Sequence, residues 1–196
     1  MSRASRRGGR CRHLWPIAVV LAVAVVVAVG LFVVQPFAIP SASMTPALRP
    51  GDRVLVLKWH AADVHRGEVI VFHEPSGWGP DAGSTDYVKR VIGLPGERVA
   101  CCSHGRVTVD GRPLKEPYLH PGDAPSTVRF DVRVPPGHVW VMGDHRSDSD
   151  DSRSHLGDPG GGMVPLDDVI GRVAYRYWPP DRLGPAPRHQ PEAVAR

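Results

Sequence analysis

An uninterrupted apolar run near the start of the chain limits what the rest of the protein can fold into. Residues 17–34 are 18 consecutive residues drawn from Ala, Val, Ile, Leu, Phe and Gly. This length is close to what a helix needs to cross the hydrocarbon core of a bilayer. No second run of this kind follows in the sequence. We therefore predict a transmembrane anchor at residues 15–34 that tethers the domain after it.

The charges on either side of this run predict its orientation. Five arginines lie between positions 3 and 12, and the first acidic residue is Asp52. The positive-inside bias then makes residues 1–14 a cytoplasmic basic arm and places the later domain outside the cytoplasm. Removing these five arginines from the 24 basic residues leaves 19 against 20 acidic residues. The domain is thus nearly neutral, which argues against a nucleic-acid partner.

A cleaved signal peptide is the alternative to an anchor. The apolar region of a signal peptide usually has about 7–15 residues and ends at a cleavage site with small residues. Here the run is longer, and residues 35–38, Gln-Pro-Phe-Ala, make a poor cleavage site. The anchor is the better interpretation, with the plasma membrane as the location of the protein.

The remaining chain reads as a mainly β domain over residues 35–178. Alternating or continuous apolar residues between turn signals predict short strands, whereas helical spacing is nearly absent after the anchor. A small β insertion is expected at about residues 97–136, and the proline-rich residues 179–196 are expected to be disordered. The predicted strands are residues 53–58, 68–72, 87–92, 98–102, 106–109, 128–134, 139–142 and 169–178.

The three cysteines do not form a disulfide framework. Cys11 lies in the predicted cytoplasmic arm, whereas Cys101 and Cys102 are adjacent in the outer domain. Adjacent cysteines can bridge only with strained geometry, so we expect structural or surface thiols at these positions. No metal-ligand spacing joins them to a pair of histidines, and we expect neither a metal nor a cofactor.

A candidate nucleophile follows the anchor closely. Ser41 and Ser43 lie between Pro40 and Pro46, and prolines bias the backbone toward extended and turn geometry. A linker is the alternative interpretation of this stretch. A serine that attacks an acyl carbon also needs a base. The sequence contains no Gly-x-Ser-x-Gly elbow, so an α/β-hydrolase site has no support.

Lys89 is the candidate base. Burial disfavours the ammonium form and lowers the pKa of a lysine, which lets a neutral amine remove a proton from serine. Val88, Val91 and Ile92 surround Lys89 in the sequence, as expected for a buried amine. An outward-facing lysine on a strand is the alternative. The histidines of the domain mostly lie in turns and polar loops, where solvated side chains are expected.

Acidic residues and arginines alternate in residues 143–153. Aspartates occupy positions 144, 148, 150 and 151, with Arg146 and Arg153 among them. This spacing does not match a calcium loop, and the arginines argue against one. It fits a network of ion pairs and hydrogen bonds, which either supports an active site or closes a loop.

Four motifs of this chain, in this order, resemble those of bacterial type I signal peptidases. They cover roughly residues 37–178 behind the apolar run. The motifs are Pro-Ser-Ala-Ser-Met-x-Pro at residues 40–46, Gly-Asp at 51–52, Tyr-Val-Lys-Arg-Val-Ile-Gly-Leu-Pro-Gly at 87–96, and Gly-Asp-x-Arg with Ser-x-Asp-Ser-Arg within 143–153.

The resemblance implies a Ser/Lys dyad protease on a mainly β fold of antiparallel sheets. Ser43 is then the nucleophile and Lys89 is the general base. The hydroxyl of Ser41 joins the Ser43 N–H in an oxyanion hole. The implied substrates are secreted preproteins with small residues at the first and third positions before the cut, which are processed at the lipid bilayer.

The resemblance also assigns supporting positions. Ser149 matches a hydroxyl that orients the lysine, and Asp151 and Arg153 match a supporting ion pair. Asp144 and Arg146 match further motif positions near the site. Two other functions stay open at this stage. One is a membrane-tethered β domain that binds without catalysis, and the other is an autoprocessing Ser/Lys protease.

Overall fold

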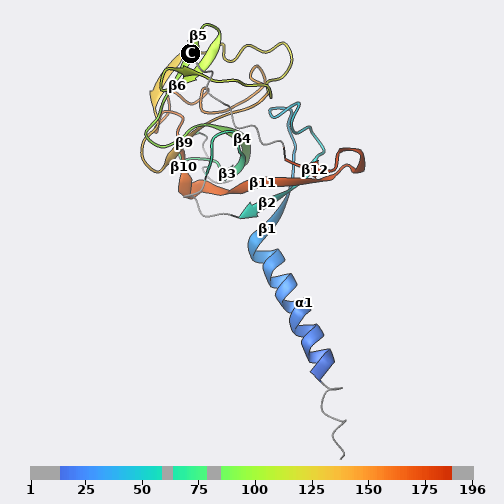
Figure 1. Ribbon diagram of the computed structural model, residues 1–196. Helices are drawn as coiled ribbons and strands as arrows, with labels where there is room; N and C mark the ends of the chain where they lie inside the picture. Colours follow the sequence, from blue (N-terminus) through green and yellow to red (C-terminus); the bar gives the residue numbers. More distant parts are fainter. Residues whose placement is uncertain (1–13, 59–63, 79–84, 187–196) are drawn as a thin grey trace, which may run out of the picture.

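The computed structural model describes residues 14–58, 64–78 and 85–186 as one helix followed by a β domain. Helix α1, Leu14–Val33, projects from the domain, and strand β1 continues directly from its end (Figure 1). The strands are β1 Val34–Ala38, β2 Arg53–Lys58, β3 Val69–His73, β4 Asp86–Gly93, β5 Arg98–Ser103, β6 Arg106–Val109, β7 Arg112–Pro113, β8 Phe130–Arg133, β9 His138–Met142, β10 Val164–Pro165, β11 Val169–Trp178 and β12 Gly184–Pro185; the short 3-10 helices are η2 Leu166–Asp168 and η3 Pro180–Arg182.

The α1 helix exposes apolar side chains along its described length. Trp15 is 75% exposed and Val26 is 71% exposed. The first turn of α1 carries no acidic residue, and its last turn carries no basic residue. In the part of the chain that the structure describes, no helix has the length and apolar character needed to cross a membrane.

Two antiparallel sheets make up the domain, as predicted from the sequence. In the larger sheet the order is β1-β2-β11-β3-β4-β9-β10, and β12 pairs with β11. The smaller sheet has the order β7-β6-β5-β8, and its strands lie inside the predicted insertion. Strands β5 and β6 lie at the end of the domain opposite α1 (Figure 1). The fold is therefore mainly β and antiparallel.

Apolar residues from both sheets meet in one core. Val99 and Val107 of the smaller sheet pack with Ile92, Trp140 and Met142 of the larger one. Gly93 permits this contact, because a Cβ atom there would lie 2.4 Å from Val99 Cγ2. The insertion is thus packed onto the end of β4, close to the strand's buried half.

Two sequence predictions need correction in this part of the chain. Residues 180–186 are ordered: η3 and β12 follow β11, and Ala186 is buried. The prediction of disorder from residue 179 onward is wrong there, because Arg182 forms an ion pair with the buried Asp52 at 2.7 Å. Residues 187–196 lie outside the described residues.

The second correction concerns the cysteines. Cys101 and Cys102 form a vicinal disulfide across a cis peptide bond, with their Cα atoms 3.0 Å apart. This differs from the structural or surface thiols expected at these positions, since the structure joins the two sulfur atoms.

Candidate active site

The segment that carries Ser43 is held between two buried anchors. Ile39 precedes it, and Met44 and Leu48 follow; all three side chains are buried in the core beside β2 and β3. The Leu48 N–H donates to the Met44 carbonyl at 2.8 Å, and the Gly51 N–H donates to the Ile39 carbonyl at 2.9 Å. The serine is therefore displayed on a rigid turn and not on a free linker.

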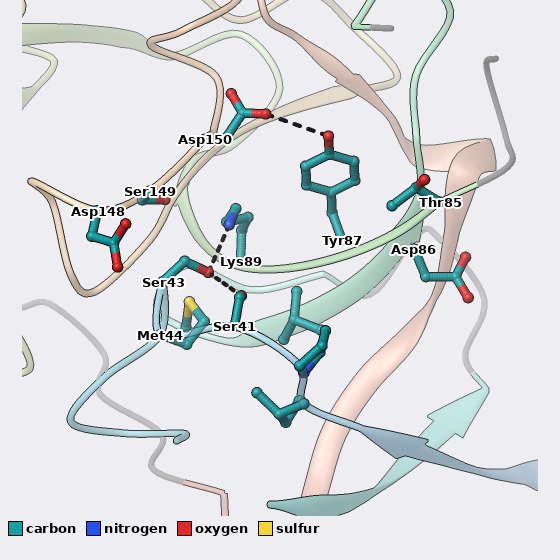
Figure 2. Close-up of a pocket in the computed structure, with 13 residues that line it drawn as sticks. Ser41, Ser43, Met44, Thr85, Asp86, Tyr87, Lys89, Asp148, Ser149 and Asp150 are labelled. Carbon is teal, nitrogen blue, oxygen red and sulfur yellow. Dashed lines mark hydrogen bonds between the residues drawn. The ribbon is translucent and has the colours of Figure 1, made fainter. Parts of the chain in front are cut away.

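Lys89 approaches Ser43 from the neighbouring strand. It occupies the middle of β4, where Ile70 of β3 lies opposite in the antiparallel register. The Lys89 Nζ donates to Ser43 Oγ at 2.9 Å (Figure 2). Exposure of Lys89 is 4%, and that of Ser43 is 7%. The two residues that the sequence singled out, 46 positions apart, are thus in direct contact in a buried place.

Burial changes the acid–base behaviour of Lys89. Desolvation lowers the pKa of its amine below the ordinary lysine value, while the carboxylates of Asp151 and Asp150 partly oppose this shift. Among the residues that the structure describes, Lys89 forms no ion pair with any carboxylate. The neutral amine is therefore easier to form than in an ordinary lysine, and in that form it can accept a proton from the hydroxyl with which it makes contact.

Ser41 lies beside the pair. Its Oγ is 3.3 Å from Ser43 Oγ (Figure 2), so the predicted oxyanion donor is adjacent to the predicted nucleophile. A cavity of about 380 Å³ opens here; its lining also includes Met44, Tyr87 and Asp150. An extended peptide entering this cavity would meet both hydroxyls together with the amine.

Tyr87 covers the amine from the same strand. The Lys89 Nζ is 5.7 Å from the centre of the Tyr87 ring, and the Tyr87 hydroxyl donates to Asp150 at 3.4 Å. Burial, with the neighbouring charges of Asp150 and Glu74, raises the pKa of Tyr87 to about 12. The phenol thus stays protonated and acts as a wall of the cavity.

A network of ion pairs forms the floor of the site. Arg153 binds both carboxylate oxygens of Asp151 at 2.8 Å, and Asp151 accepts the Gly143 N–H at 2.9 Å. Burial would raise the pKa of Asp151, but hydrogen bonds and the charge of Arg153 prevail and lower it. The predicted ion pair is present and stays charged.

Ser149 has a different partner from the one expected. Its Oγ donates to Asp151 Oδ2 at 2.8 Å, and within the described ranges no hydrogen bond joins it to Lys89. Gly143 explains how close this loop comes to the nucleophile. A Cβ atom at position 143 would lie 2.2 Å from Ser149 Oγ and 2.6 Å from the Ser43 carbonyl oxygen. Only glycine lets the Ser149 side chain and the Ser43 backbone come this close to position 143.

The other two predicted positions lie deeper. Asp144 accepts two hydrogen bonds from Arg90, at 2.7 and 2.6 Å, with both side chains fully buried. Arg146 donates to Glu116 and to the Pro125 carbonyl, each at 2.5 Å. Burial would lower the pKa of Arg146, but Glu116 outweighs it and raises the pKa. These two residues position the loop without touching the cavity.

Sequence reasoning did not find three contributors. Tyr87 carried a usable signal, since residues two apart on a strand share a face and Tyr87 precedes Lys89 by two. Asp150 was seen only as one acid of a cluster. Glu116 gave no signal, because nothing in the sequence pairs it with an arginine 30 residues away.

Comparisons with known proteins find relatives of this chain. A family model described as signal peptidase, peptidase S26, matches residues 12–178. A signal peptidase I of Mycobacterium tuberculosis is 37% identical in an alignment of 217 residues, gaps included. This alignment covers 84% of this chain and 72% of the relative. A signal peptidase I of Bacillus caldolyticus is 36% identical over 193 residues, covering 91% and 96%.

A crystal structure of a signal peptidase I from Enterococcus faecalis is also similar. It aligns with 29% identity and a TM-score of 0.44, over 57% of this chain and 97% of the other.

Proposed function

Because the chain belongs to the signal peptidase family, peptidase S26, we propose that it removes signal peptides from secreted preproteins by means of a Ser43/Lys89 dyad. The chain is a hydrolase of the serine endopeptidase class, as its relatives are. The single observation that carries the dyad is the 2.9 Å hydrogen bond between the Lys89 amine and the Ser43 hydroxyl, in a place where burial lowers the pKa of the amine.

The reaction follows from this contact. Neutral Lys89 takes the hydroxyl proton while Ser43 Oγ attacks the carbonyl carbon of the scissile peptide bond. The negative charge then moves to the carbonyl oxygen, where the Ser43 N–H and the Ser41 hydroxyl stabilise it. The Lys89 ammonium returns a proton to the departing amine, which leaves an acyl-enzyme. Water deprotonated by Lys89 hydrolyses this ester and restores the free serine.

The Asp151–Arg153 pair supports this chemistry at a distance. It holds the Gly143 N–H and the Ser149 hydroxyl, and the neighbouring His145 N–H donates to the Ser43 carbonyl at 3.0 Å. A loop fixed in this manner keeps the nucleophile within reach of the amine. The negative charge of Asp151 is neutralised by Arg153, so it does less to stabilise the lysine ammonium.

We also propose that the N-terminal segment anchors the domain on the outer face of the plasma membrane. The exposed apolar side chains of α1 and the arginines that precede it support this arrangement. Val34 and Ser43 are nine positions apart, a distance of at most about 30 Å even in an extended chain. Moreover, β1 pairs with β2 over Val34–Ala38. A preprotein with its own apolar segment in the bilayer would present its cleavage site at this level.

Substrates are proposed to be preproteins with small residues at the first and third positions before the cut. The test is cleavage of a purified preprotein by the full chain in detergent, followed by N-terminal sequencing of the product. Ser43→Ala should reduce turnover by at least about 10³-fold, because it removes the nucleophile. Ser103→Ala, which changes an exposed serine of β5, should leave turnover intact.

The same assay separates the alternatives. A preprotein that binds but is never cut would indicate a non-catalytic binding domain. Cleavage of the chain itself, with no cleavage of the preprotein, would indicate an autoprocessing protease. Near-normal turnover by Ser43→Ala would contradict the dyad and leave the family membership intact.

A further inference from the structure

Three potential metal ligands meet on the far side of the loop that supports Ser43. His120, Asp123 and His145 each offer one ligand atom, and these atoms lie within 4.8 Å of one another. All three residues are half-buried. The proposed proteolysis uses none of their side chains. We call them the 120/123/145 cluster.

Backbone hydrogen bonds hold the cluster together. The His120 N–H donates to the Asp144 carbonyl at 2.9 Å, which ties one loop to the other. The Asp123 N–H donates to the His120 carbonyl at 3.1 Å, so these two residues share one turn. The imidazole rings of His120 and His145 stack with their centres 4.0 Å apart. The fold itself brings the three side chains together from two loops.

The hydrogen bonds of His145 favour the tautomer that leaves Nε2 free to bind a metal. Thr45 Oγ1 donates its only proton to the Ala42 carbonyl at 2.8 Å. Its contact with His145 Nδ1 at 3.3 Å is therefore best formed with Nδ1–H as the donor and Thr45 as the acceptor. Nε2 then carries the free lone pair. A ligand histidine whose other nitrogen donates to an oxygen is the usual outer-shell arrangement of metal sites.

Asp123 is oriented in a comparable manner. Its two carboxylate oxygens accept the Ser147 N–H at 3.2 Å and the Ser147 hydroxyl at 2.8 Å. A second carboxylate, that of Asp148, lies 3.8 Å from His145 Nδ1 and adds negative charge at the rim.

We propose that the 120/123/145 cluster binds a divalent transition-metal ion of the zinc class. Two imidazole nitrogens and one carboxylate oxygen form a ligand set that zinc accepts, with a fourth position left to solvent. Metal bonds of about 2.0–2.1 Å place tetrahedral ligand atoms roughly 3.4 Å apart, so the three ligand atoms, which lie within 4.8 Å of one another, would move closer together when the ion binds.

The site has a direct connection to the nucleophile. The His145 N–H donates to the Ser43 carbonyl oxygen at 3.0 Å, while the Thr45 hydroxyl bridges the His145 ring and the carbonyl of Ala42, the residue directly before Ser43. A bound ion would cross-link residues 120–123 to this loop. Metal binding therefore stabilises the folded domain, and it does so whether or not the proposed proteolysis is correct.

The test is a titration of the full chain in detergent with ZnCl₂, followed by calorimetry and thermal unfolding. A ligand that binds only the folded state raises the unfolding midpoint. At a free zinc concentration of 100 times the dissociation constant, the midpoint of a chain of this size should rise by roughly 5–10 °C. Co²⁺ serves as a coloured probe, since its absorption distinguishes tetrahedral from fully hydrated coordination. His145→Gln, His120→Gln and Asp123→Asn should each remove one zinc site and the Co²⁺ spectrum.

His104→Gln is the matched control, because His104 lies in an exposed turn between β5 and β6; it should keep both the site and the midpoint shift. The metal-free midpoint of each variant shows whether it folds, and three independent ligand variants guard against the failure of one. The proposal is overturned if the wild-type chain binds no zinc. It is equally overturned if all three ligand variants keep the same stoichiometry and the same Co²⁺ absorption.

Discussion

Lys89 and Arg90 are neighbouring cations on β4 with opposite environments. The side chains of consecutive strand residues point to opposite faces. Arg90 is fully buried and donates two hydrogen bonds to the carboxylate of Asp144. Lys89 is 4% exposed, and its polar contact is the neutral hydroxyl of Ser43. One strand thus buries a neutralised charge on one side and an unneutralised amine on the other.

The difference supports the proposal that Lys89, and not Arg90, acts as a base. A guanidinium keeps its proton in any environment, so burying it requires a carboxylate partner. An ammonium can lose its proton instead, and this becomes easier when no carboxylate lies in contact. We therefore infer a structural role for the Arg90–Asp144 pair, whereas the lack of a carboxylate partner for Lys89 among the described residues supports the proposal that Lys89 acts as a base.

The largest expected effect comes from making the two positions alike. Lys89→Arg would place a permanent cation beside Ser43, and Lys89→Met would remove the base. Both should lower kcat/KM for preprotein cleavage by at least about 10³-fold, because the hydroxyl then has no group to accept its proton. The measurement is single-turnover cleavage with the folded variants, and the unfolding midpoint verifies folding.

Lys58→Met is the matched control for this comparison. Lys58 ends β2 with an exposed side chain, so the variant should retain the wild-type rate. If Lys89→Arg cleaved at a rate close to that of the wild type, a group other than Lys89 would have to be the base.

The second prediction concerns the ion pair between Arg90 and Asp144 on the other face of β4. Asp144→Asn removes the negative charge that neutralises the buried Arg90, and breaking such a pair costs about 3–5 kcal/mol in the free energy of unfolding. Urea unfolding should reveal this loss. Asp131→Asn is the control, because its pair with Arg98 is exposed and should contribute little. Equal stability of the two variants would contradict a structural role for the Arg90–Asp144 pair.

Much of the fold was predictable because its strands are short and clearly bounded. The sequence predicted residues 53–58 as a strand, and β2 occupies those residues. It did not predict β1 or β12, since Gln35-Pro36 and Gly184-Pro185 carry residues that are unfavourable in strands. Strand β1 forms an edge of the larger sheet, and β12 pairs with the long strand β11. At both places pairing with the neighbouring strand overrides the local conformational preference of these residues.

The candidate site was predictable to a different degree. Ser43 and Lys89 could be selected since each combined a chemical need with a motif. The partner of Ser149 could not, because Ser149 lies two residues from Asp151 in sequence and the direction of its hydroxyl depends on the folded loop. For the same reason the 120/123/145 cluster was invisible, since its ligands come from loops about 25 residues apart whose contact only the fold creates.

The smallest expected effect tests how electrostatics poise Lys89 itself. Deprotonation of Lys89 should produce the rising limb of kcat/KM with pH, at a pH below the ordinary lysine value of 10.5. The charge of Asp150 raises the pKa of Lys89, so Asp150→Asn should lower that pKa and move the limb to lower pH. The side chain of Asp150 is 55% exposed, so solvent screening should keep the shift below about one pH unit.

Two further measurements sharpen this last test. The shift should shrink as ionic strength rises, because salt screens exposed charges more than buried ones. Asp167→Asn changes an exposed carboxylate in η2 that does not act on the pKa of Lys89, and its profile should overlay that of the wild type. A limb that moved to higher pH in Asp150→Asn would show that Asp150 does not act on Lys89 through its charge. In that case its hydrogen bond with Tyr87 would be the contact that matters.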